Sequence, residues 1–266
     1  MNDITKLISV EFESIEDIIS KLLDGNDVVT NKIRGFLHYP SKRIRTILPL
    51  LYLKSNCCAI TKDILNIIAA GEIFHNASLL HDDVIDDAKF RRENPVIACQ
   101  LSPKMSIIAG DLLVSKAVKL ILNTKRNNIT DYFLSCVETM CDAEINQYIL
   151  RGTQLDFEQY INICKGKTSN LFITSLKSVS EICGLDINIA ENFAEIFGIV
   201  FQIRNDFEPK SVYEDDNNGI YTIRNIIDIE KINILIDNYK EMMGSIIKGF
   251  PDNIYTQGLY TLVNKL

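Results

Sequence analysis

The chain has 266 residues, of which 47% are hydrophobic, and its formal net charge is −7. This length is enough for one large domain or two small ones, and the apolar fraction is enough for a sizeable core. The sequence has no basic stripe that would follow a nucleic-acid backbone, so we expect no nucleic-acid partner. No apolar run approaches the roughly 18 residues of a membrane-spanning helix, so we expect no membrane span.

The start of the chain and the cysteines predict a cytoplasmic protein. The stretch MNDITKLISVEFESIEDII is acidic and amphipathic, and it lacks the basic and then apolar pattern of a signal peptide. The seven cysteines include no C-x-x-C pair, and an odd number of scattered cysteines is typical of reduced thiols. We therefore predict that they are small core side chains.

Helical periodicity dominates the sequence. From Ile4 to Leu22, apolar residues recur at steps of three and four, which predicts an amphipathic helix. The other stretches with this pattern are residues 41–57, 61–86, 103–122, 129–149, 157–183, 187–207 and pieces of 223–266. The breaks between them are expected at residues 25–27, 92–95, 123–128 and 214–219. None of these breaks resembles an interdomain linker, so we predict an all-α fold of about ten helices in one domain, residues 1–266.

One apolar helix ends in a cluster of carboxylates, within the stretch LLHDDVIDDAKFRREN. Four aspartates lie within six residues: Asp82, Asp83, Asp86 and Asp87. Residues four apart share a helix face, so Asp82 and Asp86 project together, with Asp83 beside them. Like charges at this spacing destabilise a helix by roughly 0.2–0.5 kcal/mol per pair, so the cluster calls for a cation.

Three interpretations of this cluster stay open at this point. The aspartates form ion pairs with Arg91 and Arg92, which follow a few positions later. Alternatively they bind Mg²⁺, a hard ion that takes one or two carboxylates together with substrate phosphates. The third interpretation is a solvated acidic helix end without a specific partner.

Two other stretches supply cations. SKRIRT places Lys42 and Arg45 three residues apart, on one helical face near a helix start, where anions are favoured. GKTSNLF contributes Lys167 but is not a P-loop, because the upstream glycine at the required spacing is absent.

A second acidic helix end follows in the stretch FQIRNDFE, which carries Asp206 and Glu208. Two acidic helix ends and several cationic groups describe a site that holds a diphosphate through bridging Mg²⁺. The chemistry open to such a site is the departure of a phosphate group assisted by metal.

At these residues the sequence resembles the trans-type polyprenyl diphosphate synthases, which include farnesyl and geranylgeranyl diphosphate synthases. The signature is D-D-x-x-D followed by two arginines, and the resemblance covers about residues 40–222. The matching parts are His75, Ser78-Leu79-Leu80-His81, Asp82-Asp83-Val84-Ile85-Asp86, Arg91-Arg92, and IIAGDLLVSKA at residues 107–117.

The resemblance implies a role for each matching residue. The ligands of Mg²⁺ would be Asp82, Asp83 and Asp86, with Asp206 as an additional candidate. Arg91 and Lys167 would contact the allylic diphosphate, so the first three aspartates and these two cations are the expected catalytic residues. The residues expected to hold isopentenyl diphosphate are Lys42, Arg45, His75 and Arg92. The remaining matches, at the reaction centre, are Gln147, Thr168 and Gln202.

The implied activity is Mg²⁺-dependent condensation of isopentenyl diphosphate with an allylic diphosphate to a linear polyprenyl diphosphate. Metal and cations stabilise the departing diphosphate mainly in the transition state. The double bond of isopentenyl diphosphate then attacks the allylic cation, and a proton passes to the released diphosphate. The family uses two or three Mg²⁺ ions, or Mn²⁺, in a helical bundle around a deep central cavity. Its members are usually dimeric, so we expect a homodimer, with a heteromer as the alternative.

The second aspartate-rich motif departs from the family pattern. Where the family has D-D-x-x-D, this chain reads NDFEP at residues 205–209, so Asp206 stays in register and Glu208 is one residue out. A family lysine in the following loop is Ile220 here. These changes support a second hypothesis, a weakly active or non-catalytic partner subunit of a heteromeric synthase. A terpene cyclase is a third, although it would not need the cations expected for isopentenyl diphosphate.

The residues before the first motif indicate the product length. Positions four and five residues earlier lie about one helical turn, roughly 5.4 Å, deeper along the helix. Here they are Ser78 and Ala77, both small, where bulky aromatics stop the chain early in the family. Phe74 lies about two turns down, and it forms a floor or packs in the core. We predict a product of C20 or longer.

Overall fold

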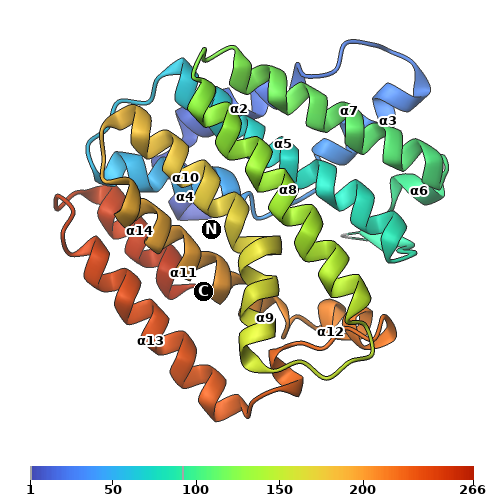
Figure 1. Ribbon diagram of the computed structural model, residues 1–266. Helices are drawn as coiled ribbons and strands as arrows, with labels where there is room; N and C mark the ends of the chain where they lie inside the picture. Colours follow the sequence, from blue (N-terminus) through green and yellow to red (C-terminus); the bar gives the residue numbers. More distant parts are fainter. Residues whose placement is uncertain (1, 92) are drawn as a thin grey trace. The chain divides into compact units, whose positions relative to one another are not determined.

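The computed structural model describes residues 2–91 and 93–266, and these residues are mostly helical (Figure 1). They divide into two compact units. Unit 1 comprises the chain up to residue 50 together with residues 60–130, and unit 2 comprises residues 51–59 and 131–266. The all-α prediction is confirmed, whereas the assignment of residues 1–266 to a single domain stays a prediction.

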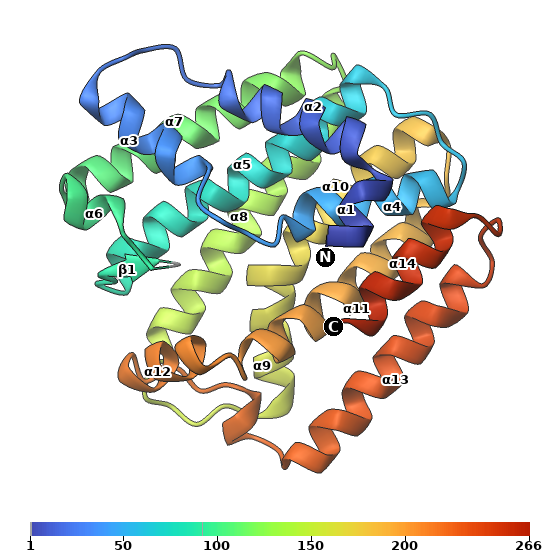
Figure 2. The same ribbon diagram turned by 180° about the vertical axis from the view of Figure 1, so that it is seen from behind.

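Unit 1 is built from helices and one short hairpin, several of which are labelled in Figure 2. Its elements are α1 (Asn2–Leu7), α2 (Ser9–Ser20), α3 (Val28–Leu37), α4 (Ile44–Ser55) as far as Leu50, α5 (Lys62–Ile85), β1 (Phe90–Arg91), β2 (Asn94–Pro95), α6 (Ile97–Gln100) and α7 (Pro103–Leu122). The two strands pair antiparallel, with Phe90 opposite Pro95 and Arg91 opposite Asn94.

Helix α5 forms the core of unit 1. It is apolar on nearly all sides, which is the pattern of a helix surrounded by other elements, and most of its side chains are buried. Thr61 caps its first turn by accepting a hydrogen bond from the Ile64 N–H. Helix α7 packs along α5, and its own start is defined by the Ser102 cap and by Pro103 in the first turn.

Unit 2 is a second group of helices. Its elements are most of α8 (Asn127–Ile149), α9 (Phe157–Cys164), a π-helical turn (Lys165–Ser169), α10 (Asn170–Cys183), α11 (Ile187–Asn205), α12 (Pro209–Asn217), a 3₁₀ turn (Ile223–Asn225), α13 (Ile229–Ile247) and α14 (Ile254–Asn264). Its core contains a chain of aromatic side chains. Tyr52 lies 5.5 Å from Phe193 between ring centroids, and Phe172 lies 5.3 Å from Phe197.

Three expectations about the helices are wrong. The stretch 157–183 is not one helix, because a π-helical turn interrupts it at Lys165–Ser169. The expected break at 214–219 is largely helical, since α12 continues to Asn217. The first amphipathic stretch is divided at Ile8 into α1 and α2. Hydrophobic periodicity continues through the π-helical turn and through Ile8, so it does not register a local change in backbone hydrogen bonding. At residues 214–217 the opposite holds, because a wholly polar stretch that resembles a turn continues a helix.

Within residues 2–91 and 93–266, none of the helices combines the length and the apolar character that a membrane crossing requires. The expectation of no membrane span therefore agrees with the described part of the chain.

Gly198 allows α11 to approach the π-helical turn closely. A Cβ atom at Gly198 would lie 2.5 Å from the Cα and 2.5 Å from the Oγ of Ser169. The neighbour is backbone, which cannot rotate away as a flexible side chain can. Gly35 on α3 offers a matched comparison, because a Cβ atom there would meet nothing within 4 Å.

We predict that Gly198→Ala lowers the free energy of unfolding and that Gly35→Ala does not. Overpacking costs about 1–3 kcal/mol, and this exceeds the gain of roughly 1 kcal/mol from replacing glycine by alanine in a helix. Gly35→Ala should keep the whole of that gain. Denaturant unfolding of the two variants and the parent checks this, and equal stability of the two variants would contradict the close approach.

Candidate active site

The four aspartates at the acidic end of α5 differ in burial. Asp83 is buried, Asp82 and Asp86 are half-buried, and Asp87 is exposed. Asp86 is the C-cap, and its N–H still donates to the Asp82 carbonyl at 2.9 Å. The last turn therefore keeps helical geometry, and Asp82 and Asp86 stay one turn apart on one face.

Asp87 ends the helix. Its φ of 50° lies in the left-handed region, which aspartate adopts more readily than most residues. The N–H of Ala88 bonds to the Asp83 carbonyl at 3.0 Å, and the N–H of Asp87 lies 3.4 Å from the Val84 carbonyl. This pair of bonds is the Schellman motif of a helix C-terminus. The fourth aspartate thus redirects the chain toward β1.

Arg91 on β1 pairs with the buried aspartate. Its Nε and Nη2 atoms each lie 2.7 Å from Oδ1 of Asp83. The ion-pair interpretation of the cluster is therefore correct for Asp83, and Asp82 and Asp86 are the partly exposed pair. Arg92, which we predicted to bind isopentenyl diphosphate, lies outside the described residues.

A stripe of half-buried residues runs back along α5 from the acidic end. His75 and Ser78 are half-buried, whereas Phe74 and Ala77 are buried. At about 100° per residue, His75 lies roughly 20° and Ser78 roughly 40° around the helix from Asp82, while Ala77 lies roughly 140° away. Of the three residues predicted to control product length, Ser78 therefore shares the face of Asp82.

The basic segment before α4 differs from its prediction. Helix α4 begins at Ile44, so Lys42 precedes the helix and Arg45 lies in its first turn. The expectation that Lys42 and Arg45 share a helical face is therefore wrong. Arg43, which follows Lys42, has φ 46°, in the left-handed region that residues other than glycine rarely adopt.

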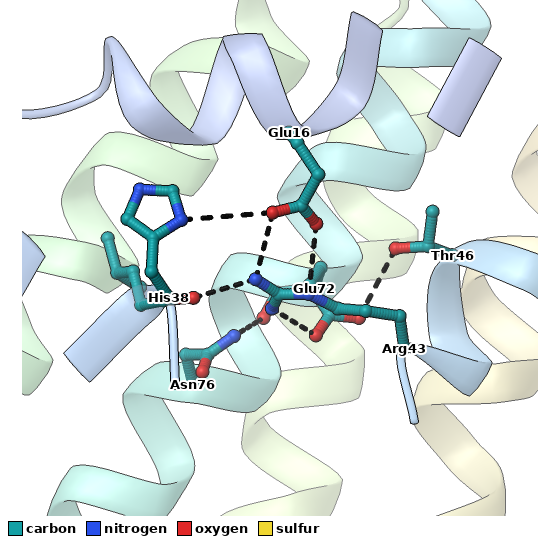
Figure 3. Close-up of polar contacts among 7 residues, drawn as sticks. Glu16, His38, Arg43, Thr46, Glu72 and Asn76 are labelled. Atoms are coloured by element: carbon teal, nitrogen blue, oxygen red, sulfur yellow. Dashed lines mark hydrogen bonds and ion pairs between the residues drawn. The ribbon is translucent and has the colours of Figure 1, made fainter. Parts of the chain in front are cut away.

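Arg43 is buried and is held by carboxylates from two helices (Figure 3). Its Nε lies 2.9 Å from Glu16 on α2, and its Nη1 lies 2.9 Å from Glu72 on α5. Its Nη2 donates to the Leu37 carbonyl at 2.7 Å. Thr46 on α4 donates to the second Glu72 oxygen at 3.4 Å. We had not identified Arg43, Glu16 or Glu72, because no spacing in the sequence indicates that these charges meet.

In unit 2, the predicted residues form two polar groups. Lys167, in the π-helical turn, lies 2.5 Å from Glu144 and donates to Gln147 at 3.0 Å. The hydroxyl of Thr168 beside it donates to Oε1 of the Gln202 side chain at 2.7 Å. The turn therefore directs two consecutive side chains to two different helices, α8 and α11. Glu144 was missed, although its position three residues before Gln147 on a helix could have indicated it.

The second group surrounds Asp206. Gln202 donates to Oδ1 and Tyr160 donates to Oδ2 of this aspartate, each at 2.7 Å. Burial raises the pKa of Asp206, although these two hydrogen bonds act in the opposite direction. Burial, together with the charge of Asp206, raises the pKa of Asp215 on α12 to about 7. Tyr160 and Asp215 carry no motif, so sequence reasoning missed them.

The second acidic helix end is not an acidic pair. Asp206 is 2% exposed, with hydrogen bonds on both oxygens, whereas Asn205 and Glu208 are exposed. Among the residues that the structure describes, no three His, Cys, Asp or Glu side chains are arranged to hold a metal ion by themselves. A metal at either acidic end would therefore complete its shell with water or substrate oxygens.

Comparison with known proteins gives the family. The family described as "Polyprenyl synthetase" matches residues 26–216. A decaprenyl-diphosphate synthase of Dictyostelium discoideum is 31% identical over 175 residues, covering 64% of this chain and 38% of that protein. A short chain isoprenyl diphosphate synthase of Methanocaldococcus jannaschii is 27% identical over 205 residues, which cover 73% of this chain and 61% of that protein. The chain thus spans less than two thirds of the length of these two curated relatives.

Solved structures agree on the fold. A decaprenyl diphosphate synthase from Rhodobacter capsulatus matches with a TM-score of 0.88 at 17% identity, covering 99% of this chain and 97% of that one. A geranylgeranyl pyrophosphate synthetase from Pyrococcus horikoshii matches with a TM-score of 0.82 at 22% identity, and the match covers 99% of this chain and 97% of that one.

The family match extends over most of the chain and includes both the acidic end of α5 and the Lys167 turn. The chain therefore belongs to the polyprenyl synthetase family.

Proposed function

We propose that this chain is a Mg²⁺-dependent trans-prenyltransferase that condenses isopentenyl diphosphate with an allylic diphosphate. The observation that carries this proposal is the acidic end of α5, where the half-buried Asp82 and Asp86 lie one turn apart. Relatives named as decaprenyl, solanesyl and geranylfarnesyl diphosphate synthases support a linear product of C20 or longer.

The acidic end of α5 fits Mg²⁺ by the chemistry of its donors. Asp82 and Asp86 offer carboxylate oxygens, and Mg²⁺ commonly takes one or two carboxylates and completes its shell with water and substrate phosphates. Two or three ions, or Mn²⁺ in their place, are expected from the family. Bound there, the metal supplies charge neutralisation for a departing diphosphate. Asp83 supports this arrangement by fixing Arg91, and Asp206 is a weaker candidate ligand because both of its oxygens accept hydrogen bonds.

The remaining residues receive the roles that the family resemblance implies. Arg91 and Lys167 bind the allylic diphosphate, and Gln147, Thr168 and Gln202 belong to the reaction centre. The isopentenyl diphosphate ligands are Lys42, Arg45, His75 and Arg92. In the reaction, the allylic C–O bond breaks and diphosphate leaves with the electron pair. The double bond of isopentenyl diphosphate forms the new C–C bond, and the released diphosphate takes the proton.

The alternative proposal is a weakly active or non-catalytic partner subunit. It is supported by the second motif, where the single aspartate in register is used in internal hydrogen bonds. For assembly we propose a homodimer, with a heteromer as the alternative. Helix α7 exposes Ile107, Ile108 and Leu112 on its surface, and grouped apolar side chains of this kind favour contact with another protein. The cytoplasmic location stays a prediction.

We expect the purified chain to elongate allylic primers with isopentenyl diphosphate and Mg²⁺, giving linear products of C20 or longer by mass spectrometry. Asp82→Asn and Asp86→Asn should each lower kcat at least 100-fold, since each removes a carboxylate ligand of the metal. Asp87→Asn is the matched control and should leave kcat within about twofold, because its role is to end the helix and asparagine also adopts the left-handed region.

Two other results would decide against this proposal. No turnover with any primer, together with activity restored by a co-purifying synthase, would establish the partner subunit. Cyclic products formed without consumption of isopentenyl diphosphate would establish a cyclase. Light scattering on the same preparation gives the number of chains.

We predict that Ser78→Phe shortens the main product by at least one isoprene unit, because Ser78 shares the helix face of Asp82. Ala77→Phe should also shorten the product, although Ala77 is buried and its enlargement costs about 1–3 kcal/mol in stability. Ser78→Ala is the control and should leave the product distribution unchanged. Products are sized by mass spectrometry. If Ser78→Phe leaves the distribution of product lengths unchanged, this face of α5 does not line the cavity that holds the growing product.

Arg43 positions the Lys42–Arg45 segment, so its removal should act mainly on isopentenyl diphosphate. We expect Arg43→Met to raise the KM for isopentenyl diphosphate about tenfold or more, and to change the KM for the allylic substrate less than about threefold. Arg43→Met leaves two carboxylates without their cation, which costs stability on the order of 3–5 kcal/mol. The milder Glu16→Gln therefore provides a second variant. Equal changes in the KM for isopentenyl diphosphate and in the KM for the allylic substrate would show that Arg43 contributes only to the stability of the fold.

A further inference from the structure

A pocket separate from the acidic end of α5 lies within unit 1. Its walls are the C-terminal part of α2, the N-terminal turn of α5 and the C-terminal part of α7. Its volume is about 570 Å³, which lies in the range of roughly 300–1,000 Å³ typical of small-molecule sites.

This pocket is remote from the residues proposed for prenyl transfer. Asn66, the deepest α5 residue that lines it, precedes Asp82 by 16 positions, or about 24 Å along a helix. The same separation turns Asn66 roughly 160° around α5 from Asp82. The pocket and the stripe that carries Ser78 therefore lie on different faces of α5.

Asn66 gives the pocket a polar floor. The residue is 7% exposed and lines the pocket. Among the hydrogen bonds of the described residues, none joins the Asn66 side chain to another residue, so its amide can bond to a molecule in the pocket. A ligand atom that accepts a hydrogen bond would satisfy this amide.

The rim of the pocket is cationic on balance. Four lysines and three aspartates line it, in a chain whose formal net charge is −7. Lys21 and Asp17, both on the α2 side, pair with each other at 2.6 Å. The remaining lining charges are the lysines 62, 116 and 119 and the aspartates 24 and 63. The excess of one positive charge is reinforced by the N-terminal turn of α5, whose N–H groups carry partial positive charge.

Apolar side chains complete the walls. Leu22 contributes from the segment that follows α2, and Leu120 contributes from α7. Leu120 follows Lys116 by four residues, so the two share a face of α7 and place an apolar group beside a cation.

We propose that this pocket binds a small phosphomonoester with an apolar body. The phosphate lies among Lys62, Lys116 and Lys119, and the body packs against Leu22 and Leu120. An acceptor atom of the ligand takes the hydrogen bond of Asn66. This inference does not depend on the proposed prenyltransferase activity, since it concerns a different face of α5 and is tested by binding.

The test is a titration of methyl-labelled full-length protein with phenyl phosphate, followed by NMR. We expect saturable shifts of the Leu22 and Leu120 methyl signals with half-saturation below about 1 mM, and no shift of Ile85 at the acidic end. Benzyl alcohol, which has the ring without the charge, should bind at least tenfold more weakly. Equal binding of benzyl alcohol would overturn the proposal in favour of a merely apolar cavity.

Matched variants locate the anion. Lys62→Gln and Lys119→Gln should each weaken phenyl phosphate binding at least fivefold, and Asn66→Leu should weaken it by a similar factor. Lys104→Gln, an exposed lysine at the opposite end of α7, is the control and should leave binding unchanged. The lysine variants alter exposed or half-exposed side chains, so an unchanged methyl spectrum confirms their fold. Absent shifts at Leu22 and Leu120, or equal binding by parent and lysine variants, would overturn the proposal.

Discussion

Two carboxylates buried on α5 constrain the segments around the candidate site. Glu72 and Asp83 lie inside unit 1, where an unpaired charge would be strongly destabilising. Each takes an arginine from a neighbouring segment: Arg43 reaches Glu72, and Arg91 reaches Asp83. Breaking such a pair costs more than the pair contributes on its own, because the remaining charge stays buried. The positions of the segments that carry Arg43 and Arg91 therefore depend on the need to pair these two buried carboxylates with a cation.

These arginines stand beside the residues to which we assign substrate. Arg43 is flanked by Lys42 and lies two residues before Arg45, and its left-handed backbone is kept by contacts from α2 and α5. Residues held in such sparsely populated conformations persist only when the surroundings determine them. The conformation of the segment that carries Lys42 and Arg45 thus depends on the ion pairs of Arg43 with α2 and α5.

In unit 2, the buried carboxylate of Asp206 has hydrogen-bond donors as partners and no arginine ion pair of the kind seen in unit 1 among the described contacts. Asp206 is satisfied by neutral donors, the hydroxyl of Tyr160 and the amide of Gln202, and burial raises its pKa. Gln202 also accepts from Thr168, so the hydrogen-bond chain extends from the π-helical turn to α11. This arrangement gives the altered second motif a structural role, and it explains why its remaining aspartate is a weaker metal candidate than Asp82 or Asp86.

The two ends of α5 carry side chains of different charge. Its C-terminal end concentrates carboxylates, and its N-terminal turn borders a pocket with three lysines not paired to Asp17. Between them most of the helix is buried, and apolar side chains surround the few polar ones, such as Glu72 and Asn76. Because the helical repeat turns the residues of the two regions to different faces, ligands at one end are kept away from the other.

Much of the fold and of the candidate site could be read from the sequence. The helix at residues 103–122 was predicted with its observed bounds, since its cap, its proline and its periodicity all agree. The aspartates of α5 and the cations at 42, 45, 91 and 167 were found because motifs fix residue types at short spacings. Local spacing also determined that Asp82 and Asp86 share a helix face.

Contacts between residues far apart in the sequence could not be predicted from motif spacing. The partners of Arg43 come from positions 27 and 29 residues away, and Tyr160 reaches Asp206 across 46 residues. The π-helical turn at Lys167 and the left-handed residues Arg43 and Asp87 are invisible to hydrophobic periodicity. Residue patterns alone predicted an all-α chain with an acidic helix end and several cations in nearby motifs. Packing decided which charges are used to neutralise one another, because the cost of a buried charge depends on neighbours that only the folded chain supplies.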